Sequence, residues 1–160
     1  MKDKQLLFDR LIDGSLDMLR STAYSILGNA ADADDAVQEA LCRAWKKYNF
    51  FCSRSKLSSW VCRITINVAC DMLRQKKREQ ANLALLTPEH EDDHRHDLAL
   101  EELQLAVCEL PEPYRSAITL GVLSGMSGEE AARKLDCKLN TLYWRISRAK
   151  EILREKLKGF

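Results

Sequence analysis

The sequence predicts an all-α protein of two small helical domains joined by an acidic linker, the C-terminal domain being a helix-turn-helix. In several stretches apolar residues recur at three- and four-residue steps, which is the period of an amphipathic helix. Residues 125–150 have the pattern of a short helix, a polar break and a second helix. The charged residues also divide the chain into two basic parts around an acidic one.

Length and composition exclude several classes of protein. The chain has 160 residues and a mass of 18.3 kDa, which corresponds to one large domain or two small ones. With 46% hydrophobic and 31% charged residues, it has the composition of a folded rather than a disordered protein. No apolar run approaches the roughly 20 residues of a membrane span, and residues 1–5 lead into no signal-peptide core. We therefore expect a cytoplasmic protein without membrane insertion.

The net charge of +1 hides a strong division along the chain. Residues 1–80 hold 14 Lys and Arg against 10 Asp and Glu, residues 81–105 hold 1 against 7, and residues 106–160 hold 10 against 7. We expect a first domain over 1–80, an acidic linker and the start of the next helix over 81–105, and a second domain over 106–160. Two basic parts suit two nucleic-acid-facing domains better than one compact enzyme.

Two helices are predicted at the start of the chain. Residues 6–27 place apolar side chains on one broad face, with breaks expected at Gly14–Ser15 and Gly28–Asn29. Three aspartates at 32, 34 and 35 then crowd the start of a second helix, where carboxylates favour the positive end of the dipole. The outer face of that helix carries Asp35, Gln38, Glu39 and Arg43, as either a solvated or a docking surface.

The segment 46–59 lacks a period and mixes aromatic, hydroxyl and basic residues. This composition suits a loop that stacks on unpaired bases, although Phe50 and Phe51 could equally well plug the core beneath a surface loop. Ser58 or Ser59 is expected to cap a third helix that ends in a basic run at 74–78. One strip of this helix carries Arg63, Asn67, Asp71 and Arg74.

The acidic linker and the cysteines give no evidence for a cofactor. Three histidines lie among carboxylates in residues 89–97, but without a rigid frame or a cysteine partner they favour a flexible linker over a metal site. The cysteines form no Cys-x-x-Cys pair and are interpreted as small buried hydrophobes or free thiols, with redox sensing as an alternative that no residue pattern supports. They are Cys42, Cys52, Cys62, Cys70, Cys108 and Cys137. No metal or other cofactor is expected.

The helix-turn-helix begins with Ser127 and Glu130, which are spaced as a capping box. A second helix is expected after a polar break, with Asn140 or Thr141 as its cap. Its outer face carries Tyr143, Trp144, Ser147 and Arg148, side chains that suit a major-groove reader. The alternative is an ordinary helical hairpin with a solvated face.

Taken together, residues 32–45, 60–74, 110–115 and 125–150 resemble a group 4 sigma-70 family factor, of the extracytoplasmic-function type. That family carries only the domains called sigma-2 and sigma-4. The four motifs occur in the right order and cover most of the chain outside the linker.

The resemblance implies a promoter-recognition subunit that has no catalytic residues and functions with core RNA polymerase, contacting the beta-prime clamp and the beta flap. Docking on the beta-prime coiled coil is implied for Asp35, Gln38, Glu39 and Arg43. Capture of the melted minus-10 strand is implied for Phe51, Ser53, Arg54, Ser55, Lys56, Asn67, Asp71 and Arg74. Reading of the duplex minus-35 element is implied for Thr141, Tyr143, Trp144, Arg145, Ser147 and Arg148. The linker matches the segment that threads toward the polymerase active site, an anti-sigma protein is an expected partner, and the free protein is expected to be a monomer.

Two departures from the family pattern concern specificity. Residues 140–145 read Asn-Thr-Leu-Tyr-Trp-Arg where members commonly have Gly-Thr-Val, a basic residue, Ser and Arg. Residues 52–54 read Cys-Ser-Arg where a turn resembling Arg-Gly-Asp is frequent. The promoter sequence therefore does not follow by analogy.

Two other classes of function fit the sequence less well. A helix-turn-helix repressor or activator would bind duplex DNA as a dimer, but no heptad or additional apolar face suggests dimerisation. A metal- or thiol-dependent enzyme would need convergent histidines and cysteines, whereas these lie in the linker and on separate helices.

Overall fold

The computed structural model describes residues 1–52, 54–86 and 95–158, with side chains over the same ranges except at 95–97. All regular elements in this part of the chain are helices and it contains no strand, so the predicted all-α class is confirmed. None of its helices is both long enough and apolar enough to cross a bilayer. The elements are α1 (Lys2–Leu27), α2 (Ala30–Lys46), η1 (Tyr48–Phe50), α3 (Leu57–Ala84), α4 (Arg95–Cys108), α5 (Glu112–Ile118), η2 (Thr119–Leu123), α6 (Gly128–Lys134) and α7 (Leu139–Leu157).

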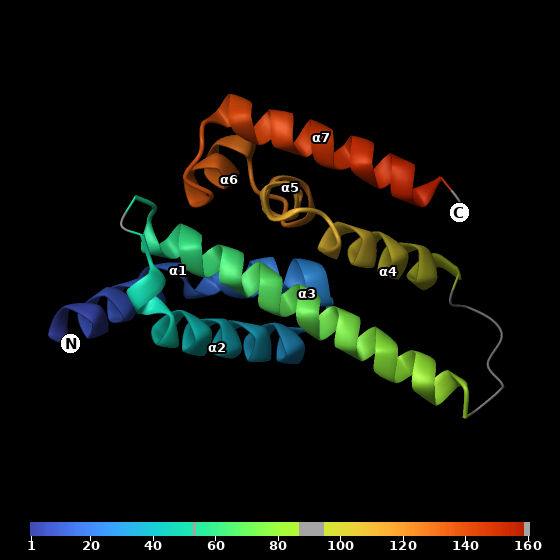
Figure 1. Ribbon diagram of the computed structural model, residues 1–160, viewed down its shortest axis with the longest axis horizontal. Helices are drawn as coiled ribbons and strands as arrows, with labels where there is room; N and C mark the ends of the chain where they lie inside the picture. The colour runs from blue at the N-terminus through green and yellow to red at the C-terminus, as the bar shows by residue number, and fades with distance from the viewer. Residues whose placement is uncertain (53, 87–94, 159–160) are drawn as a thin grey trace.

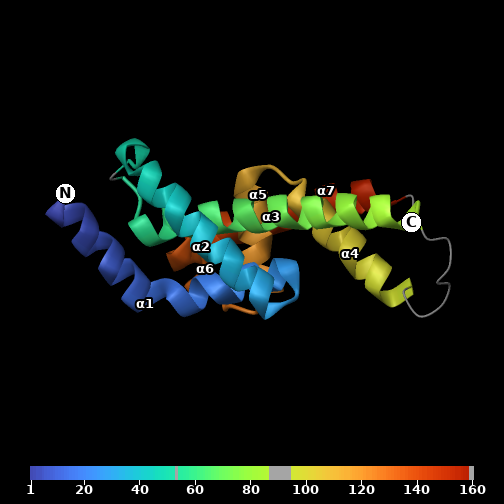
Figure 2. The same cartoon turned by 90° about the horizontal axis from the view of Figure 1, so that it is seen from below.

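Helix α3 lies in the middle of the molecule, between two groups of helices (Figure 1). Helices α1 and α2 pack on one side of it, and α4, α5 and α6 contact it from the other, with α7 outermost. The view from below shows α1 and α2 crossing each other beneath α3 (Figure 2). One hydrophobic core continues across both groups, joining Leu19 and Ile66 to Leu120, Leu135 and Leu142.

Helix α1 is continuous, so the predicted break at Gly14–Ser15 is wrong. A glycine inside a helix costs only about 1 kcal/mol, and here Ser15 is buried together with the apolar face, which keeps the helix intact. The second predicted break is correct, because Gly28 adopts φ 74° and its N–H donates to the Tyr24 carbonyl at 2.8 Å. The Asn29 side chain then accepts from the Asp32 N–H at 2.9 Å and caps α2.

The predicted caps of the two longest later helices are wrong. Helix α3 begins at Leu57 instead of after Ser58 or Ser59, and α7 begins at Leu139 instead of after Asn140 or Thr141. In both helices the first residue is a leucine that packs on the core, so tertiary packing overrides the preference of hydroxyl and amide side chains for the cap position. The Ser127 cap is correct, since its hydroxyl accepts from the Glu130 N–H at 3.2 Å.

The shared core leads to a stability prediction. Ile66 is fully buried in α3, so Ile66→Ala should lower the free energy of unfolding by about 2–5 kcal/mol. The matched control is Leu86→Ala, which removes a side chain that is 77% exposed and should change stability by less than about 0.5 kcal/mol. Urea denaturation measures both, and equal losses in the two variants would contradict the assignment of Ile66 to the core.

Candidate nucleic-acid interface

The N-terminal half of α7 exposes two large aromatic side chains. Leu142 and Ile146 are buried, whereas Tyr143 is 53% and Trp144 is 61% exposed. Tyr143 lies against the start of α6, where a Cβ added at Gly128 would be 2.5 Å from the tyrosine hydroxyl. A side chain at position 128 would have to displace the tyrosine ring, so Tyr143 packs against the bare backbone at the start of α6.

The other residues predicted for the minus-35 element surround these aromatics. Ser147 and Arg148 are exposed, and Thr141 and Arg145 are half-buried. Arg148 donates to Glu151 at 2.8 Å, and this hydrogen bond raises the pKa of the exposed guanidinium. The face thus offers hydroxyl, aromatic and cationic groups along about two turns of one helix, which is the chemistry of a groove-reading helix.

Phe50 and Phe51, in the loop before α3, have different environments, although the sequence did not distinguish between them. Phe51 packs between Tyr48 and Trp60, with ring centroids 5.9 and 5.2 Å apart, whereas Phe50 is 84% exposed. Phe51 therefore packs against other aromatic rings, whereas the ring of Phe50 is accessible. Arg54 and Lys56 are exposed and Ser55 is half-buried, while Ser53 lies outside the described residues.

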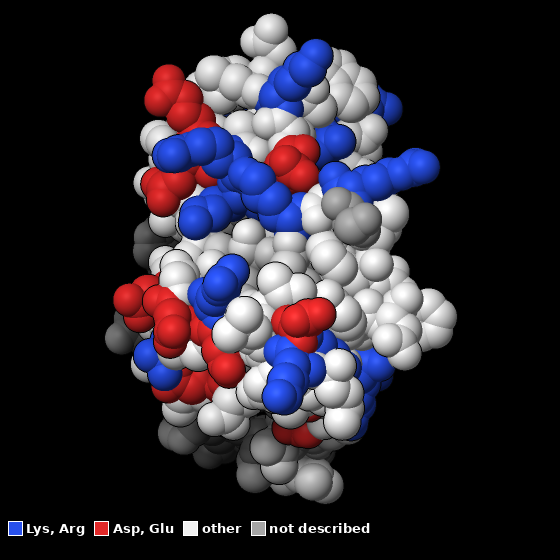
Figure 3. All heavy atoms as spheres, turned by 90° about the vertical axis from the view of Figure 1, so that its left-hand side faces the viewer, with Lys and Arg blue, Asp and Glu red and all other residues white. Residues whose placement is uncertain are grey.

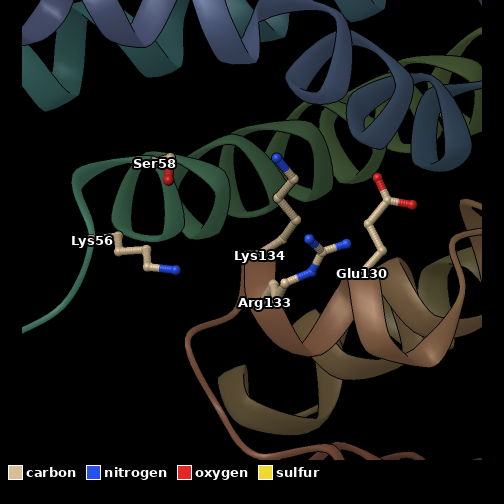
Figure 4. Close-up of a pocket in the computed structure, with 5 residues that line it drawn as sticks. All are labelled: Lys56, Ser58, Glu130, Arg133 and Lys134. Atoms are coloured by element: carbon tan, nitrogen blue, oxygen red, sulfur yellow. The ribbon is translucent and has the colours of Figure 1, made fainter.

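An open cleft of about 320 Å³ lies between the start of α3 and helix α6. Lys56 and Ser58 line one side, and Glu130, Arg133 and Lys134 line the other (Figure 4). Lys and Arg side chains gather across the upper part of this end of the molecule, and most of the acidic ones lie lower (Figure 3). Arg133 and Lys134 were not predicted as site residues, although they form a basic pair in the last turn of α6.

The polar strip of α3 is partly covered by the C-terminal half of the chain. Asn67 accepts a hydrogen bond from Arg115 of α5, and Arg74 donates to the backbone carbonyl of Cys108 at the end of α4. Asp71 remains exposed and is paired with Arg74 at 3.3 Å and with Arg43 at 3.7 Å. Two of the three minus-10 candidates on α3 are therefore engaged by α4 and α5.

A disulfide crosses the same contact. Cys70 of α3 and Cys108 of α4 are bonded, with Cα atoms 5.3 Å apart, so the interpretation of these two cysteines as free or merely packed thiols is wrong. They are separated by 38 residues, and only the crossing of two helices brings them together, a relation that cysteine spacing does not reveal. The free cysteines are Cys42 and Cys52, which are exposed, Cys137, which is half-buried, and Cys62, which is buried.

On α2, the residues predicted to dock on the polymerase form an accessible face. Asp35, Gln38 and Glu39 are exposed, and Arg43 reaches Glu39 at 2.8 Å. No group of three His, Cys, Asp or Glu side chains within the described ranges could hold a metal ion. The side chains of the linker histidines lie outside these ranges.

Comparison with known proteins identifies the class. The family model for sigma-70 region 2 matches residues 11–79, and that for sigma-70 region 4 matches residues 100–153. The ECF RNA polymerase sigma factor SigW of Bacillus subtilis is 28% identical, over 98% of this chain and 92% of its own length. The ECF RNA polymerase sigma factor EcfG of Rhodopseudomonas palustris is 34% identical, over 84% of this chain and 76% of its own.

A solved structure agrees with these matches. The sigma factor RpoE from Bartonella quintana, in complex with the anti-sigma factor NepR, has a TM-score of 0.53 and 31% identity, covering 99% of this chain and 98% of that one. The fold and the motifs define a sigma-70 family protein. More narrowly, the chain belongs to the extracytoplasmic-function group of that family, whose members are transcription initiation factors and not enzymes.

The buried thiol of Cys62 leads to a pH prediction. Burial raises the pKa of Cys62 from 9.0 to about 12, against the opposing charge of Arg63. Above about pH 9 the unfolded state therefore loses a proton that the folded state keeps, so this contribution to stability is lost as pH rises from 9 toward 12. Urea unfolding of the wild type between pH 9 and 10.5 should show an additional loss of up to about 1.4 kcal/mol per pH unit relative to Cys62→Ala. Parallel pH dependences of the two proteins would refute the prediction.

Proposed function

We propose that this sigma factor binds core RNA polymerase and directs initiation by reading a duplex minus-35 element with α7 and an unpaired minus-10 strand with α3 and its preceding loop. The observation that carries the proposal is the exposed face of α7, where Tyr143, Trp144 and Arg148 project from a helix whose opposite face is buried. A helix-turn-helix presents its second helix to the major groove, where such side chains meet base edges, thymine methyls and phosphates.

The remaining groups support a second contact with DNA. The exposed ring of Phe50 and the cations Arg54 and Lys56 suit an unpaired strand, since base–aromatic stacking is worth about 1–3 kcal/mol per base. Across the cleft, Arg133 and Lys134 add charge that suits a phosphate backbone. On this proposal, residues 1–80 and 106–160 act as two DNA-facing domains, and the acidic segment 81–105 links them.

The partners follow from the same proposal. The exposed face of Asp35, Gln38 and Glu39 on α2 would dock on the beta-prime clamp, and the C-terminal domain would contact the beta flap. The Bartonella quintana neighbour is bound to an anti-sigma factor, which supports an anti-sigma partner for this chain as well. On this proposal the protein works with polymerase in the cytoplasm. The free protein is a monomer.

Run-off transcription on a pool of genomic fragments tests the function. Core polymerase with the reduced protein should give discrete transcripts that core polymerase alone does not. Arg148→Ala should reduce them by roughly 5- to 150-fold, because a lost base or phosphate contact costs about 1–3 kcal/mol. The matched control is Arg154→Ala, which removes an exposed arginine further along α7 and should change the yield by less than about twofold.

Two results would contradict the proposal. If core polymerase gains no initiation while the protein alone shifts duplex fragments, a repressor or activator function replaces it. If Arg148→Ala and Arg154→Ala are equally active on the same promoters, α7 does not read the minus-35 element.

A further inference from the structure

The disulfide between Cys70 and Cys108 lies inside the strip of α3 that is proposed to read the minus-10 strand. Residues at i, i+3 and i+7 share one face of a helix, so Asn67, Cys70 and Arg74 point the same way. All three are engaged by the C-terminal half: Asn67 by Arg115, Cys70 by Cys108, and Arg74 by the Cys108 carbonyl. The bond between the two sulfurs therefore holds α4 against the face that a bound strand would contact.

The noncovalent part of this contact brings two positive charges close together and leaves one buried donor without a partner in the described part of the chain. Arg115 donates to the Cys108 carbonyl at 3.2 Å, so two guanidinium groups converge on one backbone carbonyl. Burial lowers the pKa of Arg115, as does the nearby charge of Arg74, while Glu112 opposes the shift. The buried Nε of Arg115 also has no hydrogen-bond partner among the described residues. An unpartnered buried donor is costly, so the disulfide closes a contact whose noncovalent part includes an unsatisfied polar group.

We infer that Cys70 and Cys108 form a reversible thiol–disulfide switch that holds α4 and α5 over the minus-10 face of α3 when oxidised and frees that face when reduced. The inference rests on the proposed function. Proteins that work among reducing thiols rarely keep structural disulfides, and the bonds that they do form are usually transient and respond to redox conditions. A bond that ties one DNA-facing region to the other, instead of stapling a single domain, has the placement that such a response requires.

The oxidant is a low-molecular-weight disulfide, RSSR. One cysteine thiolate attacks a sulfur of RSSR, forming a mixed disulfide and releasing one RS⁻. The second cysteine thiolate attacks the protein sulfur of that mixed disulfide, releasing the second RS⁻ and forming the Cys70–Cys108 bond. The two thiolates released take up the two protons lost by the cysteines, and the two electrons lost by the protein reduce RSSR to two RSH.

The burial of both cysteines determines which arrangement of the helices each step requires. Both cysteines are 0% exposed in the closed arrangement, so the first attack requires the two groups of helices to be apart. The second attack requires them to be together. Oxidation therefore traps the closed arrangement whenever the open one is sampled. Cys62 is equally buried but has no cysteine partner, and burial raises its thiol pKa to about 12, so it serves as an internal control.

The test uses the full chain equilibrated in glutathione buffers that range from fully reduced to fully oxidised. Alkylation of the remaining thiols and peptide mass spectrometry give the fraction that carries the Cys70–Cys108 bond. Run-off transcription and binding of a single-stranded oligonucleotide carrying the minus-10 sequence of an active promoter are measured on the same samples. We expect both activities to fall at least about tenfold as the bond forms, and to return when the protein is reduced.

Variants separate the switch from general damage by oxidation. Cys108→Ser changes a residue of α4 and leaves the strip of α3 intact, so it should be active when reduced. It can form at most a mixed disulfide at Cys70, so oxidised glutathione should not trap it in the closed arrangement, while Cys62→Ala should respond as the wild type does. Oxidation of the wild type itself needs no substitution, so a variant that fails to fold does not remove the test. Full activity of the bonded protein, or no Cys70–Cys108 bond in any buffer, would overturn the switch. A reduced wild type that supports no initiation would instead overturn the proposed function.

Discussion

The burial of α3 between two groups of helices is the constraint on which the rest of the structure depends. Its inward side chains, such as Ile66, join the core of α1 and α2 to that of α5, α6 and α7. Its opposite strip provides Asn67 and Arg74 to the contact with α4 and α5. The same helix therefore stabilises the fold and presents the side chains proposed to bind the promoter strand, so a closed molecule and a bound strand compete for one surface.

This competition is consistent with a factor that binds promoter DNA weakly unless core polymerase is present. Each proposed DNA contact is small, and two weak contacts become strong only when both sites are engaged at a fixed spacing. In the closed arrangement α7 still exposes Tyr143 and Trp144, but Asn67 and Arg74 of the α3 strip are engaged by α4 and α5, so the second site is incomplete. Core polymerase, by holding the two halves apart, would supply the geometry that the free chain lacks.

The sequence predicted the elements well and their long-range contacts poorly. Helical periodicity and the Ser127 cap located α6 and α7, because both signals depend on residues a few positions apart. The starts of α3 and α7 were misplaced because Leu57 and Leu139 pack on the core, which no local signal reveals. Lys56 was predicted as a site residue from the composition of its loop. Arg133 and Lys134 line the same cleft only because folding brings α6 next to that loop. The Cys70–Cys108 bond was missed for the same reason, since it depends on two helices crossing.

The most direct test of this account is the distance between the two groups of helices in the reduced protein, free and bound to core polymerase. Spin labels introduced as unnatural amino acids at Lys46 of α2 and Lys150 of α7, both exposed, leave the native cysteines intact for pulsed electron paramagnetic resonance. The account predicts a population at the closed distance in the free protein and a shift to a longer distance on polymerase. The same short distance in both states would show that the strip of α3 never becomes free, and would contradict it.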